Sequence, residues 1–548
     1  MIPGKQNARF VEIAESLKPQ LKTRVEHALR VVKVERDENS LMGWKAVDAG
    51  RVEDVGSLNG GDQVIYDFGG HRAGTFEFDI ESVLVGVEPA DAPCRLKLVF
   101  GEVLNDVAES FDDYKAWVSK SWLPDEIINV DYLPEHVHMP RRHAFRYVKI
   151  EVISTSPRYG VKISNPIANA VTSAPWEDPA ILSFASKGKE MSEEEKDGLR
   201  KIDEVALRTL RNCMHTVYED GPRRDMRLWI GDLRLQALCS YATFKDYDLA
   251  KRCLYLFAGM PFNDEGLLCA CVYEKPKPYF GGNCIADYAM LFAVTLLDYV
   301  KASGDKQTGK DLFEIAAKQF TFFAPNYSED LRYNVPPAGD ASESSSSWHF
   351  VDWEPKLEKE CAEHAIMIYC LKAIAELASL LQVGEEPSYV LGTGSESQPI
   401  STLVPKLIEA HNKHYYDHEL GVYVSGPEKQ ISWGSNAWAV IAGVPESKDI
   451  AQRALKAAYT RPESVQGLTP YLHHYLCDAF IVAGLEDLAL KHIKEYWGSM
   501  VQAGGETFFE AWMPKEPRAS PYGDLHSNSF CHAWSCTPAL LLRQMGFE

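Results

Sequence analysis

The sequence has little of three features that mark other classes of protein. Its 12 cysteines include no CxxC pair, and Cys269 and Cys271 are one residue apart, which is poor spacing for a zinc site. No uninterrupted apolar run reaches the roughly 18 residues of a membrane span. Basic residues number 57 against 78 acidic ones, which disfavours nucleic acid and membrane as partners. We therefore expect a soluble, acidic protein with reduced, buried cysteines.

The N-terminus also lacks the apolar run of a signal peptide, because charged residues stand where that run would be. Together with the reduced cysteines, this predicts a cytoplasmic location. The 548 residues suggest two to four domains, and 45% apolar with 25% charged residues is typical of a globular protein. Aromatics are abundant at 11%, which fits either an enzyme that stacks on sugar rings or large helical cores.

The first 170 residues contain short segments in which apolar and polar residues alternate. This period near two is typical of half-buried strands. Glycine pairs at 60–61 and 69–70 are expected to separate them. The segments are Gln63–Phe68, Gly74–Asp79, Cys94–Phe100 and Phe145–Val152. The pattern predicts a β-sandwich, similar to a jelly roll, after a helical stretch over Arg9–Val34 that is interrupted at Pro19.

The rest of the chain is predicted to be helical. A proline-containing linker over 171–190 comes first, and apolar residues then repeat at spacings of three and four. The predicted helices are Glu194–Cys213, Asp232–Phe257, Cys284–Ala302, Gly309–Phe323, Leu357–Leu381, Val404–His414, Trp433–Val444, Asp449–Thr460, Pro470–Ala483, Leu485–Tyr496 and Phe530–Met545. We therefore expect a multidomain α plus β protein: 1–170 an N-terminal helix plus β-sandwich accessory domain, 191–548 an (α/α)6 barrel. An irregular helical bundle is the alternative. The serine run 342–347 is expected to be a solvated loop.

The densest polar cluster is the loop 220–232, which holds three Asp, three Arg and Trp229. Most charged loops are solvated surface, and that interpretation is the alternative here. However, proline and two glycines shape the backbone, and tryptophan is rarely left on an ordinary loop. Paired Asp and Arg side chains hold each other rigid while presenting carboxylates to a hydroxyl-rich ligand. The loop is therefore a candidate sugar-binding site.

A second cluster lies near the C-terminus, over 504–512 and 528–535. Glu510 stands among two phenylalanines and Trp512, a more apolar setting than a solvent-exposed surface carboxylate usually has. Glu506 is the rival carboxylate. His532 is either a site residue or a core histidine satisfied by the backbone.

A third cluster, over 348–355, contains Asp352 and Trp353, which could hydrogen-bond to a sugar and stack against it. For Trp348 and Trp433, core packing and substrate stacking explain the sequence equally well. Asp287 begins a predicted helix, where it could be only a first-turn cap.

The loop 220–232 resembles the signature of glycoside hydrolase family 78, the α-L-rhamnosidases. The matching positions are Asp220, Pro222, Arg224, Asp225, Arg227, Leu228, Gly231 and Asp232. The family's usual acid, a glutamate, is Met226 here, and one residue is missing around Trp229. In a subgroup of the family the preceding aspartate serves as the acid, and that position is Asp225. The segments around Glu510, His532 and Asp352, and the β segments before residue 170, resemble the same family.

The resemblance implies an inverting α-L-rhamnosidase with Asp225 as general acid and Glu510 as general base. It further implies that a set of substrate-binding residues surrounds the pair. They are Asp220, Arg224, Trp229, Asp232, Asp352, Trp353, Trp433, Trp512 and His532. The sugar's methyl group is expected against an aromatic wall that includes Trp229 and Trp353. No metal or organic cofactor is implied, and the expected partner is an L-rhamnoside.

Two other functions remain open from the sequence. A catalytically inactive rhamnose-binding relative is one, because Met226 replaces the usual acid. Another glycosidase, a phosphorylase or a lyase on the same barrel is the other. The sequence leaves the leaving group and its linkage undetermined. The oligomeric state is equally open, a homodimer being one option.

Overall fold

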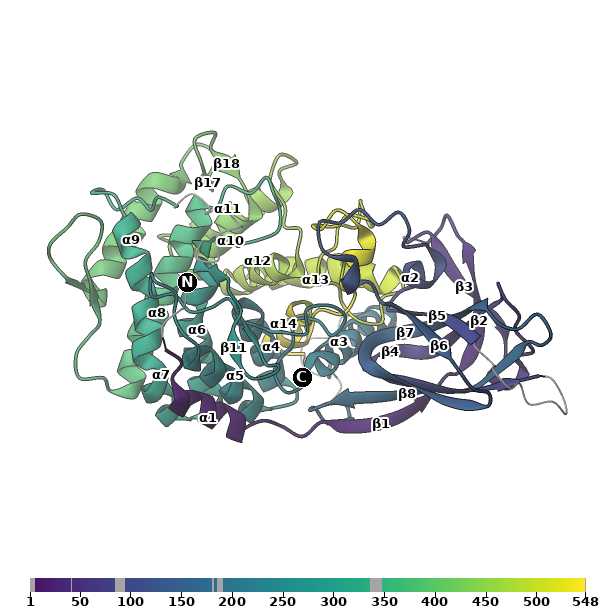
Figure 1. Cartoon of the computed structure of the whole chain (residues 1–548). Coiled ribbons are helices and arrows are strands. Elements are labelled where there is room, and N and C mark those ends of the chain that lie inside the picture. The colour runs from purple at the N-terminus through teal and green to yellow at the C-terminus, as the bar shows by residue number, and fades with distance from the viewer. Residues whose placement is uncertain are drawn as a thin grey trace.

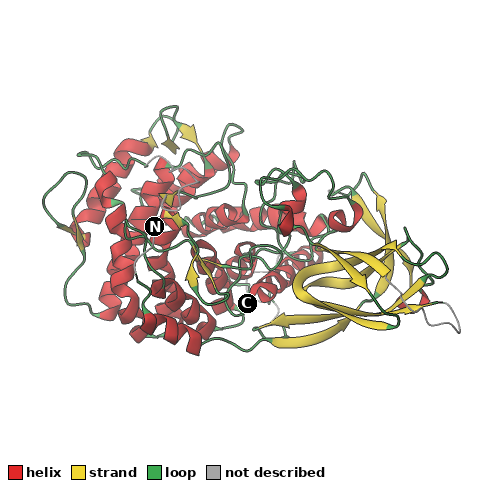
Figure 2. Ribbon diagram, viewed as in Figure 1, coloured by secondary structure: helices red, strands yellow, loops and turns green. Residues whose placement is uncertain are grey.

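The computed structural model describes residues 5–40, 42–83, 94–179, 182–184, 191–335 and 347–547. The strands of the N-terminal sheet gather at one end of the molecule, and most helices, with several short strands among them, lie at the other, as Figures 1 and 2 show. We call residues 22–172 the β part, and 193–547 together with the N-terminal helix the helical part. Most of the serine run 342–347 and much of the linker 171–190 lie outside the described residues.

The β part is built on one antiparallel sheet of eight strands, counted over the described residues. The order is β1-β8-β4-β7-β5-β6, and β2 pairs with both β3 and β4. The strands are β1 (Lys22–His27), β2 (Arg30–Arg36), β3 (Trp44–Gly50), β4 (Gln63–Ser82), β5 (Cys94–Gly101), β6 (Asp125–Val130), β7 (Glu135–Ser154) and β8 (Val161–Thr172). A short helix, α2 (Leu104–Ala108), follows β5. The N-terminal β-rich domain predicted from the alternation is therefore present.

Two of the predicted strands are halves of one. Gln63–Phe68 and Gly74–Asp79 both lie in β4, whose pairing with β7 shifts register between Asp67 and Arg72. Gly69 adopts a φ of +83° at this point, a conformation that glycine reaches without strain. The glycine pair bends the strand through a bulge instead of ending it. The aromatic residues of β4 then face one buried core together with Phe100 and Phe145.

The prediction of a helix over Arg9–Val34 was wrong beyond its first turns. The helix α1 spans only Ala8–Ser16, and strands β1 and β2 follow. After Pro19 the chain alternates valine with charged residues, and this β-strand pattern prevails over the helical one. The helix α1 packs against α5 (Tyr247–Gly259), where the rings of Phe10 and Tyr255 lie 5.5 Å apart. By its contacts α1 therefore belongs with the helical part.

Apart from 3-10 turns and strands of two to four residues, the rest of the helical part, as far as the structure describes it, consists of twelve further helices. They are α3 (Glu193–Cys213), α4 (Ile230–Ala242), α5 (Tyr247–Gly259), α6 (Ala286–Ser303), α7 (Lys306–Lys318), α8 (Glu360–Leu381), α9 (Ile400–Tyr415), α10 (Trp433–Ile441), α11 (Lys448–Thr460), α12 (Pro470–Val482), α13 (Glu486–Gln502) and α14 (Pro538–Gln544). The predicted helix Asp232–Phe257 is two helices, because the chain turns at Lys245 with a φ of +58°. The last helix begins at Pro538 and not at Phe530, and a 3-10 turn precedes it.

The helices are arranged as alternating inner and outer members. The even-numbered helices α4, α6, α8, α10 and α12 contact one another in succession, and odd-numbered helices cover them. The inner helices α6 and α8 are apolar around most of their circumference, whereas the outer α7 and α11 bury one face. By length and composition α8 could cross a membrane. It packs against α6, α7, α9 and α10, and these contacts make it a core helix.

The two parts meet at a buried charged contact. The guanidinium of Arg223 donates to both carboxylate oxygens of Asp106 at 2.7 and 2.8 Å. Glu102 lies beside this pair and accepts the backbone N–H of Phe530 at 2.7 Å. The β part therefore holds two segments of the helical part, the loop 220–232 and the loop that precedes α14.

Candidate active site

A cavity of about 320 Å³ opens where the β part meets the helical part. Its size is at the lower end of the range for small-molecule sites. It is lined by four carboxylates, two arginines, a histidine and a majority of aromatic and apolar side chains. The lining residues are Trp117, Val118, Trp122, Asp220, Arg224, Asp225, Arg227, Trp229, Asp232, Asn283, Ile285, Tyr288, Trp348, Phe350, Trp353, Glu510, Tyr522, His532 and Trp534.

The loop 220–232 is held in a fixed shape by its own backbone. Asp220 donates its N–H to the carbonyl of Arg227, and its Oδ1 accepts the Arg227 N–H at 3.0 Å. A Cβ at Gly221 would come within 2.8 Å of the Cys531 carbonyl, so only glycine allows the loop to lie this close to the C-terminal segment. The N–H of Ala533 in turn donates to the carbonyl of Asp220 at 2.8 Å. Two clusters about 300 residues apart in sequence thus form one site.

Glu510 is a buried carboxylate surrounded by donors. Arg224 donates to both of its oxygens at 3.0 and 3.3 Å, the Tyr522 hydroxyl donates to Oε1, and the Ser529 N–H donates to Oε2 at 3.2 Å. Burial alone would raise the pKa of Glu510, but the charge of Arg224 and these hydrogen bonds outweigh it and lower that pKa. Glu510 is therefore ionised at neutral pH.

Asp220 and Asp232 have the opposite electrostatic balance. Burial raises the pKa of each carboxyl well above its usual range, and the charges of neighbouring carboxylates raise it further. His532 lies between them: its Nε2 is 3.7 Å from Oδ2 of Asp220, and its Nδ1 is 3.7 Å from Oδ1 of Asp232. Burial lowers the pKa of His532 to about 4, so the ring is neutral at pH 7. The surroundings thus favour the protonated form of Asp220 and Asp232 and the ionised form of Glu510.

Asp225 is the most solvent-accessible of the four carboxylates. Its side chain is 19% exposed, against 6% for Asp220, 3% for Asp232 and 4% for Glu510. Asp225 accepts a long hydrogen bond from Arg224 at 3.4 Å. Asp225 therefore lies toward the open side of the cavity.

Met226, at the position of the family's usual glutamate, takes a left-handed backbone with a φ of +52°. Its N–H donates to the carbonyl of Gly221 at 3.2 Å, and its side chain is not among those that line the cavity. The substitution therefore removes a carboxylate from this position without placing the methionine in the site.

An aromatic wall faces the carboxylates. Trp229 and Trp353, which the sequence predicted, both line the cavity. Phe350 stacks beside Trp534 at 5.8 Å between ring centroids and meets Trp353 edge to face at 5.3 Å. Trp229 comes directly before α4. The ring of Tyr288 packs against Gly231 in the first turn of that helix, where a Cβ would lie only 2.3 Å from the ring. The wall is thus rigid and closely packed.

Three residues predicted to contact substrate do not line this cavity. Asp352 turns its carboxylate toward the backbone N–H groups of Leu468 and Thr469. Trp433 packs against His473 and His492 in the helical core, and Trp512 lies in the same core, where its indole N–H donates to Ser499. In each case burial in the core prevails over the sequence pattern that suggested a sugar contact.

The rival carboxylate Glu506 is also outside the cavity. Arg146 of β7 donates to Oε1 at 3.1 Å, and Arg208 of α3 donates to Oε2. Glu506 therefore joins the β part to the helical part.

Trp117, Trp122 and Tyr522 are among the lining residues that the sequence did not indicate and that the fold brings in from elsewhere in the chain. Trp117 and Trp122 come from the segment between α2 and β6 of the β part, and Tyr522 comes from the loop between the two C-terminal clusters. The tryptophans stand among polar loop residues, the same signal that singled out Trp229. Nothing in the sequence places them in this cavity, because their position depends on how the two parts pack.

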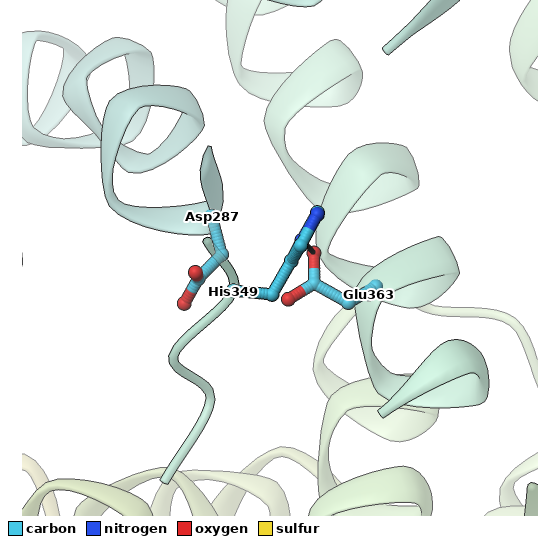
Figure 3. Close-up of side chains that lie close together, drawn as sticks. All are labelled: Asp287, His349 and Glu363. Carbon is cyan, nitrogen blue, oxygen red and sulfur yellow. Dashed lines mark ion pairs between the residues drawn. The ribbon is translucent and has the colours of Figure 1, made fainter. Parts of the chain in front are cut away.

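A buried acidic cluster lies directly behind the aromatic wall. Among the described residues it is the group whose donor atoms, from Asp287, His349 and Glu363, all lie within 4.8 Å of one another, and Figure 3 shows the three side chains. Such donors could hold a divalent cation. However, Asp287 already accepts the N–H groups of Phe350 and Val351 at 2.8 and 3.1 Å, and His349 pairs with Glu363 at 3.2 Å. Through the two hydrogen bonds of Asp287, the cluster supports the backbone of the wall at Phe350.

Comparisons with known proteins show the family to which the chain belongs. Residues 28–170 match the glycosyl hydrolase family 78 alpha-rhamnosidase N-terminal domain, and residues 192–545 match the bacterial alpha-L-rhamnosidase 6 hairpin glycosidase domain. The chain belongs to the α-L-rhamnosidases of glycosyl hydrolase family 78. It is therefore a glycoside hydrolase, as the resemblance of the loop 220–232 predicted.

Solved structures of this family share the fold. A rhamnosidase from Klebsiella oxytoca with rhamnose bound is 35% identical over 99% of both chains, with a TM-score of 0.88. The family 78 rhamnosidase of Bacillus sp. GL1 is 18% identical, with a TM-score of 0.68 over 92% of this chain and 50% of its own. An α-L-rhamnosidase of Streptomyces avermitilis complexed with L-rhamnose is 15% identical, with a TM-score of 0.63 over 96% of this chain and 44% of its own. No curated protein sequence matches the chain.

Proposed function

We propose that this enzyme hydrolyses terminal α-L-rhamnosides with inversion, using Asp225 as general acid and Glu510 as general base. The observation that carries the proposal is a cavity that holds two carboxyl groups in different settings, one buried and one partly exposed. Glu510 is held ionised by Arg224 and Tyr522, while a second carboxyl group, Asp225, stands toward the open side. Inverting glycosidases need such a pair, one group to activate water and one to protonate the leaving oxygen.

The surroundings of Glu510 suit a base that must stay ionised in a closed site. The guanidinium of Arg224 donates to Glu510, to the Tyr522 hydroxyl and to the carbonyl of Ser527, so Arg224 positions the base more than it binds sugar. Its guanidinium also lies over the Tyr522 ring, 4.2 Å from the centroid. A base held on several sides is already oriented toward the water that it activates.

The position of Asp225 suits an acid. The leaving oxygen joins the bound sugar to a group that extends toward solvent, so the acid must stand between the cavity interior and its mouth. Asp225 is the carboxyl that meets this condition, because Asp220, Asp232 and Glu510 are all nearly fully buried. To act, Asp225 must carry a proton in the complex with substrate.

The remaining cavity residues fit a deoxy sugar. In the protonated form that their burial favours, Asp220 and Asp232 can both donate to and accept from ring hydroxyls, and His532 offers one donor and one acceptor. Oδ1 of Asp232 has no hydrogen-bond partner within the described part of the chain, so it is free to bind a hydroxyl. The apolar wall of Trp229, Trp353 and Phe350 is suited to the 6-methyl group of rhamnose.

We further propose that the helical part is an (α/α)6 barrel and that the β part is its accessory β-sandwich. The alternating contacts of inner and outer helices support the barrel. The cavity then lies at the barrel mouth, covered on one side by the β part.

The test is hydrolysis of 4-nitrophenyl α-L-rhamnoside followed by NMR of the first sugar released. An inverting enzyme gives β-L-rhamnose before mutarotation, and α-L-rhamnose as the first product would contradict the inverting mechanism. An enzyme that binds rhamnose yet hydrolyses no rhamnoside would instead be an inactive relative, which the replacement of the usual acid by Met226 makes the second candidate.

A further inference from the structure

The mouth of the cavity carries a tryptophan that no part of the hydrolytic mechanism uses. Trp117 lines the cavity although it belongs to the β part, and 72% of its surface is exposed. An exposed indole leaves a large apolar face in water, which is unfavourable by about 25 cal/mol for each Å². Tryptophan is enriched at interfaces, because it combines a large apolar ring with an N–H that finds a hydrogen-bond partner.

Trp117 is exposed but fixed in place. Its backbone N–H donates to the carbonyl of Tyr522 at 3.2 Å, and its indole N–H donates to the carbonyl of Pro521 at 3.4 Å. The same segment is anchored at Lys115, whose N–H donates to Asp524, and at Tyr114, whose hydroxyl lies 2.9 Å from that of Ser527. Figure 1 shows this blue segment beside the yellow C-terminal one. The indole edge is therefore held while its face stays open.

Aromatic rings lead from Trp117 into the cavity. Its ring centroid lies 5.6 Å from that of Tyr522, which lies 6.2 Å from that of Trp353 in the wall. Arg227, which also lines the cavity, places its guanidinium over the rings of Trp122 and Tyr273. A group that leaves the cavity past Asp225 thus emerges between aromatic side chains.

We propose that Trp117 is the stacking platform of a leaving-group site, and that this site selects rhamnosides whose leaving group is a flat aromatic ring. The inference rests on the proposed function, because it places the rhamnose in the cavity and the leaving oxygen beside Asp225. A planar ring can lie against the open indole face, whereas a methyl group is too small to cover it. Such stacking contributes about 3- to 10-fold in affinity beyond the area that it buries.

The experiment measures binding without turnover. Phenyl and methyl 1-thio-α-L-rhamnosides, which resist hydrolysis, are titrated calorimetrically into wild type, Trp117→Ala, Trp117→Phe and Tyr132→Ala. Tyr132 is the matched control, because it is 71% exposed on the same β part but does not line the cavity. We expect the preference of wild type for the phenyl ligand to fall about 3- to 10-fold in Trp117→Ala. It should persist largely in Trp117→Phe and fully in Tyr132→Ala.

The outcomes separate this inference from the proposed function. Equal phenyl-to-methyl ratios in wild type and Trp117→Ala, with both ligands bound, overturn the leaving-group site and leave the rhamnosidase proposal intact. If Trp117→Ala weakens a rhamnosyl-glucose thioglycoside but not the phenyl ligand, the platform takes a sugar and the aromatic assignment is wrong. If wild type binds neither ligand and hydrolyses no rhamnoside, the proposed function fails and this site fails with it.

Discussion

Removing the charge of Asp106 tests whether the contact between the β part and the helical part stabilises the protein. The Asp106 and Arg223 side chains are 0% and 2% exposed and share two hydrogen bonds. Asp106→Asn keeps the shape of the side chain but leaves Arg223, whose guanidinium also donates to the His526 carbonyl at 2.9 Å, with Glu102 at 3.3 Å as its remaining carboxylate partner. Breaking a buried pair from one side typically costs about 3–5 kcal/mol, because the remaining charge stays buried.

The expected shift in melting temperature follows from chain size. An unfolding entropy of about 2.1 cal/mol/K per residue gives roughly 1.2 kcal/mol/K for a chain of this length. Asp106→Asn should therefore lower Tm by about 3–4 °C in calorimetry, if the chain unfolds in one transition. The control is Glu314→Gln, whose partner Lys318 lies 3.7 Å away on the surface, and it should shift Tm by less than about 1 °C. Equal shifts for the two variants would refute a structural role for the buried pair.

Three further predictions concern single side chains. Tyr522→Phe removes a hydrogen bond to the ionised Glu510, so kcat/KM should fall about 10- to 100-fold. The acidic limb of the pH profile of kcat/KM should shift to higher pH, because the loss of this donor raises the pKa of Glu510. Contacts with Asp106 and Glu109 outweigh burial and raise the pKa of His526 to about 9. The stability that His526 adds is thus complete below about pH 6.5 and lost as pH rises toward 9, so the Tm difference between wild type and His526→Gln should shrink over that window. Asp352→Asn should lower Tm with KM for the rhamnoside unchanged, because Asp352 does not line the cavity; a raised KM would contradict its placement.

The secondary structure was predictable where one period dominates a segment. The helices α3, α6 and α8 begin and end within about three residues of the prediction, since their apolar residues repeat regularly. The break at Lys245 and the bend at Gly69 were not predicted, because a helical pattern continues across the first and a glycine pair usually ends a strand. Local sequence gives periodicity, but packing decides whether a break occurs.

The site was partly predictable for a similar reason. Asp220, Asp225, Glu510 and His532 belong to clusters whose composition is unusual, and the fold brings all four to one cavity. Asp352 and Trp512 belong to equally unusual clusters yet face the core. Whether a polar or aromatic residue turns toward a cavity or away from it depends on tertiary contacts, which a single sequence does not contain.

The measurement that tests the central claim most directly compares two leaving groups across the proposed pair. We would determine kcat/KM for 4-nitrophenyl and methyl α-L-rhamnoside with wild type, Asp225→Asn and Glu510→Gln. Loss of the base should slow both substrates about 10²- to 10⁴-fold, whereas loss of the acid should slow the methyl glycoside by that factor and the aryl glycoside far less, because nitrophenolate leaves without a proton. A folded Asp225→Asn or Glu510→Gln variant that hydrolyses the methyl glycoside at the wild-type rate would contradict the assignment.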